Sequence, residues 1–171
     1  EEYNAKRAAT QNAQSAAAAS GSDAAGGPSP SPTAPAPSTG SAKSGFWYTD
    51  FASAQADAKA LRRPLFVSFS GSDWCTYCQQ LDKNIFSSAA FREFAKTDVV
   101  PLLIDFPRKA PLPPKQAAQN ETMRKELKIE SLPTMALLKP DGTLIGTAGY
   151  QDVQPAQFID SIRGIIANTQ M

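Results

Sequence analysis

Two cysteines spaced three residues apart constrain this chain more than any other feature. Cys75 and Cys78 are its only cysteines, and they follow an apolar run, Leu65–Phe69, that predicts a buried β-strand. After them, Leu81 and Ile85 continue the helical spacing that Cys78 begins. Two thiols on the first turn of a helix lie close enough to form a disulfide. We therefore expect a strand that leads into a dithiol at the start of a helix, with Cys78 facing the core.

The expected positions of the two thiols predict different roles. Cys75 begins the helix and should lie nearer to solvent, where unpaired N–H groups and the helix dipole stabilise a thiolate. Cysteines so placed have pKa values lowered from about 8.5 to roughly 3.5–7.5. The carboxylate of Asp73 opposes this shift by charge repulsion, so the net change in the pKa of Cys75 stays open. We expect Cys75 to attack the disulfide of a partner and Cys78 to resolve the mixed disulfide.

Other functions for the cysteine pair are weaker. A structural disulfide across three residues would constrain the unfolded chain very little. A zinc site needs about four ligands, but the sequence has no histidine and no second cysteine pair. The missing histidine also excludes hydrolase triads that use an imidazole base. We expect redox chemistry with no metal and no bound cofactor, and with another thiol protein as the source of electrons.

The first 45 residues differ in composition from the rest. They are rich in alanine, proline and serine, and five of the chain's 14 prolines fall between Pro28 and Pro37. Such a segment cannot bury enough apolar surface to fold, so we predict a disordered tail and linker over residues 1–45 and a folded domain over residues 46–171. A tether of this kind, beginning at Glu1 without methionine, favours an exported periplasmic, envelope or secreted protein that has lost a signal or anchor. A trimmed chain and a cytoplasmic location are the alternatives.

Charge and hydropathy narrow the classes of partner. A formal net charge of +1 gives no reason to expect nucleic acid or an anionic membrane. No apolar run approaches the roughly 20 residues that span a bilayer, so no membrane span is expected in this chain. Residues 106–114 form a proline-rich loop that carries Arg108 and Lys109. These two cations are expected to be solvated, with attraction of an acidic partner as the alternative.

Hydrophobic periodicity and turn residues predict alternating helices and strands beyond residue 46. The predicted helices cover about 51–61, 75–84, a short segment after Ser87 or Ser88, 115–127 and a last segment from Pro155, and the predicted strands cover 65–69, 99–104, 135–138 and 143–147. Right-handed crossovers make the first two strands parallel, and the last two form an antiparallel hairpin. We predict an α/β domain with a mixed sheet and helices on both faces. Strands 65–69 and 99–104 are expected at its centre, with the dithiol at the carboxyl end of the first.

Two motifs in this order resemble the thioredoxin-like fold superfamily. They are Trp74-Cys75-Thr76-Tyr77-Cys78 after a strand and Leu132-Pro133-Thr134 before the hairpin. The resemblance covers about residues 51–167 and is strongest to bacterial envelope-type thioredoxin-like proteins. It implies a cis Leu132–Pro133 bond beside the dithiol, with the Leu132 backbone free to pair with an extended substrate. It also implies that Trp74 forms a rigid wall of the site. Tyr77 is expected to tune the thiolate or contact substrate, with simple packing as the alternative.

The resemblance implies a thiol–disulfide oxidoreductase that acts on protein disulfides, with a membrane thiol reductase as a candidate electron donor. The chain departs from thioredoxins where they carry a buried acid and a lysine on neighbouring strands, because it has Ser68-Phe69 and Pro101 or Leu102 there. The dipeptide between the cysteines is Thr76-Tyr77, without the histidine of the strong oxidants, and this favours a reductase. The alternatives are a non-catalytic thioredoxin-fold adaptor or chaperone and, more remotely, a peroxidase of the same fold.

Overall fold

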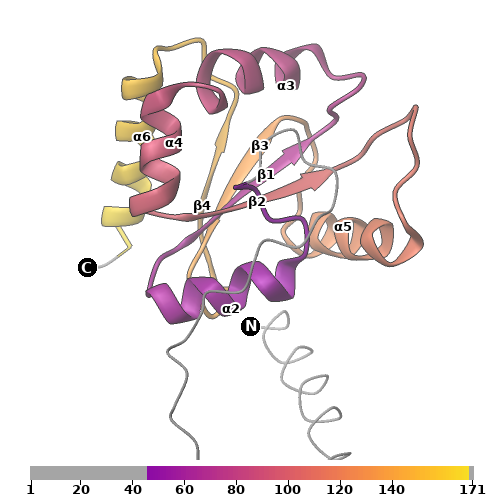
Figure 1. The fold of residues 1–171 in the computed structure, drawn as a ribbon, viewed down its shortest axis with the longest axis horizontal. Helices are drawn as coiled ribbons and strands as arrows, with labels where there is room; N and C mark the ends of the chain where they lie inside the picture. The colour runs from indigo at the N-terminus through magenta and orange to yellow at the C-terminus, as the bar shows by residue number, and fades with distance from the viewer. Residues whose placement is uncertain (1–45, 170–171) are drawn as a thin grey trace, which may run out of the picture.

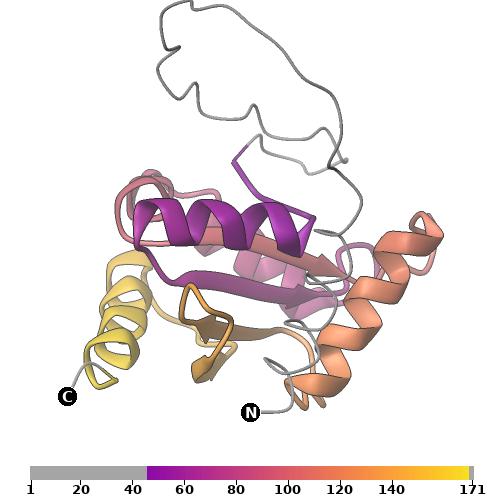
Figure 2. The same ribbon diagram turned by 90° about the horizontal axis from the view of Figure 1, so that it is seen from below.

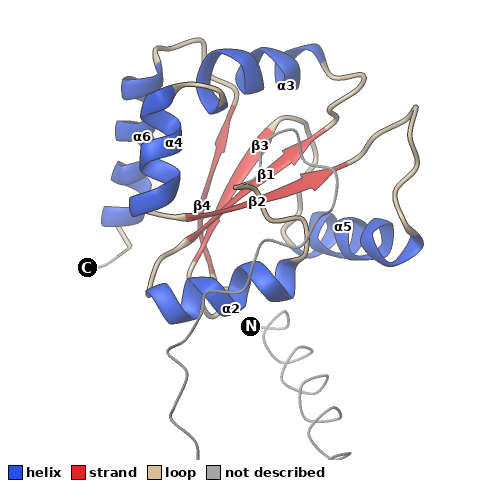
Figure 3. Ribbon diagram, viewed as in Figure 1, coloured by secondary structure: helices blue, strands red, loops and turns tan. Residues whose placement is uncertain are grey.

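The computed structural model describes residues 46–169, which form a four-stranded sheet covered by helices (Figure 1). The strands lie in the order β2-β1-β3-β4. Their bounds are β1 (Leu65–Ser70), β2 (Val100–Asp105), β3 (Thr134–Leu138) and β4 (Leu144–Gly149). β1 runs parallel to β2 and antiparallel to β3, and β3 and β4 form the antiparallel hairpin (Figure 3). The predicted mixed sheet is confirmed, whereas the predicted tail, residues 1–45, lies outside the described residues.

Helices cover both faces of the sheet, as predicted. The core on one face includes residues of α2 (Phe51–Leu61) and α5 (Pro114–Glu126). The core on the other face includes residues of α3 (Thr76–Leu81), its π-helical continuation η1 (Asp82–Phe86), α4 (Ala89–Thr97) and α6 (Pro155–Ala167). Figure 2 shows α2 and α6 on opposite sides of the strands. Within residues 46–169, no helix has both the length and the apolar character needed to cross a bilayer.

β1 is buried on both faces, which explains its apolar run. Leu65, Val67 and Phe69 belong to the core beneath α2 and α5, and all three side chains are fully buried. Phe66 belongs to the opposite core, where its ring centroid lies 5.4 Å from that of Phe91 in α4. Because strand side chains alternate between faces, this one strand joins both cores and provides a rigid base for the residues that follow it.

The helices begin where short polar side chains can cap them. Asp50 accepts a hydrogen bond from the backbone N–H of Ser53 at 2.9 Å, and Ser88 accepts one from Phe91 at 3.1 Å. Pro155 takes the first turn of α6, where the missing N–H costs no helical hydrogen bond. These local signals predicted the starts of α2, α4 and α6 within a residue or two.

One part of the predicted sheet is wrong, because β2 is an edge strand rather than a central one. Among residues 46–169, the outer side of β2 makes a single isolated bridge, between Tyr48 and Leu102. There, Tyr48 donates to the carbonyl of Pro101 at 2.9 Å and accepts from Leu103 at 2.8 Å. An apolar run indicates that both faces of a strand are covered, but it does not indicate whether the strand has a neighbour on each side. Pro101, which lacks an N–H, is compatible with an edge position.

Candidate active site

The dithiol lies just beyond the carboxyl end of β1, as predicted. Cys75 and Cys78 are joined by a disulfide, and their Cα atoms are 5.2 Å apart. Cys75 is the N-cap residue of α3, and its sulfur accepts a hydrogen bond from the backbone N–H of Cys78 at 3.3 Å. The N–H of Gly71 points to the sulfur of Cys78 at 3.5 Å. Both sulfurs therefore lie within a framework of backbone donors that suits a negative charge on sulfur.

The two cysteines were predicted to differ in exposure, but in the structure their exposed fractions are nearly the same. Cys75 is 7% exposed and Cys78 is 4% exposed, so Cys75 is nearer to solvent only by a narrow margin. Its side chain turns back over the first helical turn to cap Cys78 and to bond its sulfur, and this covers it. Its neighbours in the chain are open to solvent, with Trp74 38% and Tyr77 58% exposed. The disulfide thus lies just below the surface, near two exposed aromatic side chains.

Trp74 is held in place from three directions. A Cβ atom added to Gly71 would lie 2.5 Å from Cε2 of the indole, so only glycine allows the ring to sit this close to the backbone. The indole Nε1–H donates to the carbonyl of Phe106 at 2.7 Å. The guanidinium of Arg108 lies 3.8 Å from the ring centroid, within the range of a cation–π interaction.

A second set of contacts joins the dithiol turn to the loop that follows β2, residues 106–113, which we call the post-β2 loop. The Asp73 carboxylate accepts hydrogen bonds from the backbone N–H groups of Arg108 at 3.0 Å and Lys109 at 2.6 Å. These N–H groups, that of Arg108 foremost, lower the pKa of Asp73, and the Lys109 charge adds to the effect. Ser72 donates to the Asp105 carboxylate through its backbone N–H at 2.9 Å and its hydroxyl at 2.6 Å.

The sequence-based interpretation missed this network. It treated Asp73 only as a source of repulsion for the Cys75 thiolate, and it assigned no partner to the backbone of the post-β2 loop. A carboxylate beside the cysteine motif was the available signal, since such groups readily accept bonds from loop N–H groups. Nothing local in the sequence identified the loop that supplies them.

On the other side of the dithiol, Tyr77 packs against Tyr150, which follows β4. Their ring centroids are 5.0 Å apart, and the Tyr150 hydroxyl donates to Oε1 of Gln80 at 3.1 Å. The packing alternative for Tyr77 is therefore present in the structure, although the ring remains largely exposed.

The Leu132-Pro133 segment enters β3 close to the end of β1. Thr134, the first residue of β3, stands opposite Phe69 in the antiparallel register. The segment before it therefore runs past the point where the dithiol turn begins. The Leu132–Pro133 peptide bond is cis. Within residues 46–169, no hydrogen bond occupies the backbone N–H or carbonyl of Leu132.

The interior behind the cysteines carries no ionisable pair. Among residues 46–169, the buried polar side chains are those of Gln55, Ser68 and Asn120, and none of them is charged. The residues of β2 that stand opposite Ser68 and Phe69 are Leu103 and Ile104, rather than Pro101 or Leu102 as expected from the sequence, and they too are apolar. The buried interior of residues 46–169 therefore offers no carboxylate that could take a proton from Cys78.

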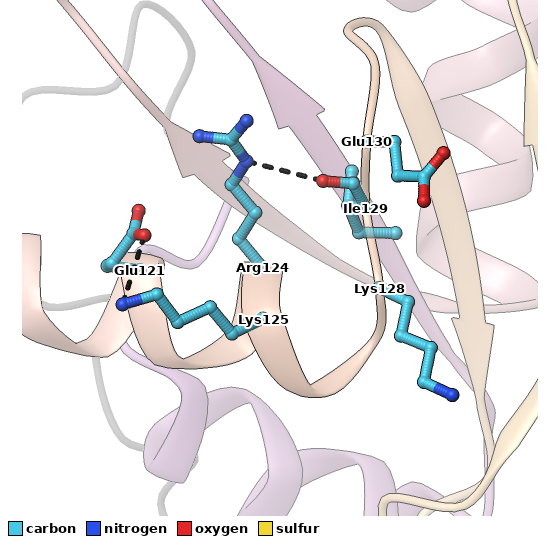
Figure 4. Close-up of a pocket in the computed structure, with 6 residues that line it drawn as sticks. All are labelled: Glu121, Arg124, Lys125, Lys128, Ile129 and Glu130. Atoms are coloured by element: carbon cyan, nitrogen blue, oxygen red, sulfur yellow. Dashed lines mark hydrogen bonds and ion pairs between the residues drawn. The ribbon is translucent and has the colours of Figure 1, made fainter.

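Other parts of the described chain bear on possible metal or ligand sites. No group of three or more potential metal-ligating side chains occurs within residues 46–169. A surface hollow near the end of α5 is lined by Glu121, Arg124, Lys125, Lys128, Ile129 and Glu130 (Figure 4). Its charges are partly occupied with each other, because Lys125 lies 3.4 Å from Glu121 and Arg124 donates to the carbonyl of Ile129 at 3.3 Å. Neither cysteine lines this hollow.

Comparisons with known proteins agree with this geometry. DsbH of Chlamydia pneumoniae, a disulfide bond reductase, is 23% identical over 125 residues, which cover 73% of this chain and 75% of DsbH. DsbJ of the same organism, a thioredoxin-related protein, is 30% identical over 92 residues, which cover 54% of this chain and 26% of DsbJ. A solved structure of a DsbH oxidoreductase has a TM-score of 0.68 at 22% identity, covering 85% of this chain and 95% of the other. The thioredoxin-like domain family matches residues 51–164, so this chain belongs to that family.

Proposed function

We propose that this protein is a thiol–disulfide oxidoreductase that reduces protein disulfides, with Cys75 as the nucleophile and Cys78 as the resolving thiol. The observation that carries the proposal is the Cys75–Cys78 disulfide at the start of α3, directly after a strand that is buried on both faces. A rigid strand and a capped helix hold the two sulfurs at bonding distance, so the pair can close and open with little movement of the backbone.

The first step uses the reduced protein. The Cys75 thiolate attacks one sulfur of a client disulfide, a bond forms between Cys75 and that sulfur, and the second client sulfur leaves as a thiolate. The backbone N–H of Cys78, which contacts the Cys75 sulfur in the structure, stabilises the anion before attack. In the same way, the N–H of Gly71 stabilises negative charge on Cys78 as it loses its proton.

The second step resolves the mixed disulfide. The Cys78 thiolate attacks the Cys75 sulfur, forms the disulfide that the structure contains, and releases the first client sulfur. The client gains two electrons and two protons overall, and the dithiol loses them. A second thiol protein then returns the oxidised pair to the dithiol, and a membrane thiol reductase is our candidate for this donor.

We infer that clients dock as extended segments along Leu132. Its unoccupied backbone N–H and carbonyl can pair with a strand-like peptide, since backbone pairing gives affinity with little dependence on side chains. Because Thr134 stands opposite Phe69, such a segment would cross the carboxyl end of β1, where the dithiol turn begins. Trp74, fixed by Gly71 and Phe106, would form one wall beside the crossing segment.

The reductase direction and the envelope location complete the proposal. The dipeptide Thr76-Tyr77 contains no histidine that would stabilise the thiolate of a strong oxidant, and the relative DsbH is named a reductase. Small changes at these positions matter, because about 30 mV in reduction potential corresponds to about 1.4 kcal/mol. The Ala/Pro/Ser-rich composition of residues 1–45 suits a tether in the cell envelope.

The proposal is tested by the reduction of insulin disulfides with a thiol donor, followed as turbidity. The wild-type chain should accelerate the reaction, and both Cys75→Ser and Cys78→Ser should abolish multiple turnover. Cys78→Ser should still accumulate a covalent complex with a client, whereas Cys75→Ser should not. Wild-type protein that binds insulin without accelerating its reduction would instead identify a non-catalytic adaptor. Accumulation of the complex on Cys78 would reverse the assigned roles.

A further inference from the structure

The post-β2 loop presents a cation at the edge of the proposed active site. Asp73 holds the backbone of Arg108 and Lys109, and Phe106 holds the indole of Trp74. These contacts connect the loop to the turn that carries the cysteines, although the two segments lie more than 30 residues apart in the sequence. The Arg108 guanidinium thereby lies over the Trp74 ring, and Trp74 directly precedes Cys75 in the sequence.

The Arg108 guanidinium has no acidic partner among residues 46–169. None of the ion pairs formed there includes it, and no hydrogen bond leaves its side chain. The carboxylate of Asp73 is occupied by backbone N–H groups, and the side-chain charge that acts on it comes from Lys109. The carboxylate of Asp105 is occupied by Ser72 and by the N–H of Phe106. A planar guanidinium with free donors, fixed on an aromatic ring, is suited to bind a carboxylate.

We propose that Arg108 is a specificity-determining residue that selects client segments with an acidic side chain beside the disulfide to be reduced. The proposal rests on the function proposed above. A client sulfur that reacts at Cys75 brings its neighbouring residues over Trp74, where a carboxylate meets the Arg108 fork. Lys109, exposed on the same loop, adds positive charge to this side of the site. The preference is electrostatic and partly exposed, so it weakens as salt screens the charges.

The test compares peptide substrates that differ in one charge. Each peptide contains one intramolecular disulfide and carries either Glu or Gln at both positions that flank the first cysteine. We expect the full chain to reduce the Glu peptide with a kcat/KM about two- to fivefold higher at low salt, the range of an exposed ion pair. The difference should lie mainly in KM and should shrink at about 0.5 M salt, where the screening length falls to a few ångströms.

Three variants separate charge from structure. Arg108→Gln should remove most of the preference and leave only the smaller contribution of Lys109, and Arg108→Lys, which keeps the charge, should retain more of it. Lys59→Gln, at the end of α2 and on the opposite side of the molecule from α3, should leave the ratio unchanged (Figure 1). Because the readout is a ratio within each variant, a general loss of activity does not mimic the effect.

The outcomes distinguish this inference from the proposed function. If wild-type protein reduces both peptides through Cys75 at equal rates, or if Arg108→Gln keeps the preference, the assigned role of Arg108 is wrong while the oxidoreductase stands. If wild-type protein reduces neither peptide nor insulin, the proposed function itself fails.

Discussion

Replacing Gly71 with alanine tests whether the wall of the site is as tightly built as its contacts indicate. The added Cβ would lie 2.5 Å from Cε2 of Trp74 and 2.8 Å from Cζ2 and Nε1, all three within one rigid ring. The indole must therefore move. Its movement breaks the bond from Nε1 to the Phe106 carbonyl and separates the ring from the Arg108 guanidinium.

The two lost interactions set the expected magnitude. A hydrogen bond of this kind contributes about 0.5–1.5 kcal/mol, and an exposed cation–π contact about 0.5–1 kcal/mol. Gly71→Ala should therefore lower the free energy of unfolding by about 1–2.5 kcal/mol, because the exposed indole has room to turn away rather than strain the backbone. In urea unfolding of the oxidised protein, the midpoint should fall without a change in the slope.

Gly164 in α6 provides the matched control, because a Cβ added there would meet nothing within 4 Å. Gly164→Ala should raise stability by about 0.4–1 kcal/mol, since alanine reduces the conformational entropy of the unfolded chain and favours helix. The same substitution thus has opposite signs at the two positions. Equal stability of Gly71→Ala and wild type, with the Nε1–H resonance of Trp74 unshifted in NMR spectra, would refute the close packing of Gly71 against Trp74.

Two further predictions concern the core and the loop. Phe66→Ala should destabilise the protein by about 3–5 kcal/mol in urea, because this fully buried ring leaves a cavity in the core formed with α4; a loss below 1 kcal/mol would contradict that packing. The N–H groups of Arg108 and Lys109 hold the pKa of Asp73 below the ordinary value of an aspartate, so its contribution to stability is present above that ordinary value and lost as the pH falls through the folded-state pKa. Asp73→Asn should therefore flatten the acid limb of the stability–pH curve, measured by urea unfolding between about pH 2 and 5, and an unchanged limb would exclude this role.

Local patterns predicted most of the elements that position the dithiol. The stripe of Cys78, Leu81 and Ile85 is buried as expected, because helical spacing alone places these residues on one face. Asp50 and Ser88 cap their helices, since an N-cap acts within three residues of itself. These signals involve residues close together in the sequence, so they could be predicted without knowing which distant segments meet.

Features that depend on distant contacts were not accessible in the same way. The edge position of β2 depends on which strands pair with it, and an apolar run does not indicate its partner strands. The bonds from Arg108 and Lys109 to Asp73 join segments about 35 residues apart, so neither segment reveals the other. The low exposure of Cys75 depends on the direction of its side chain, which the disulfide and the N-cap bond turn back over the helix.

The relative reactivity of the two thiols tests the roles proposed for Cys75 and Cys78. The reduced protein is alkylated with a limiting amount of iodoacetamide at about pH 6, where an ordinary thiol is mostly protonated, and the modified residue is identified by mass spectrometry. We predict that Cys75 is modified several times faster than Cys78, because its sulfur is the N-cap acceptor and the less buried of the two. Faster modification of Cys78, or equal and slow modification of both, would contradict it.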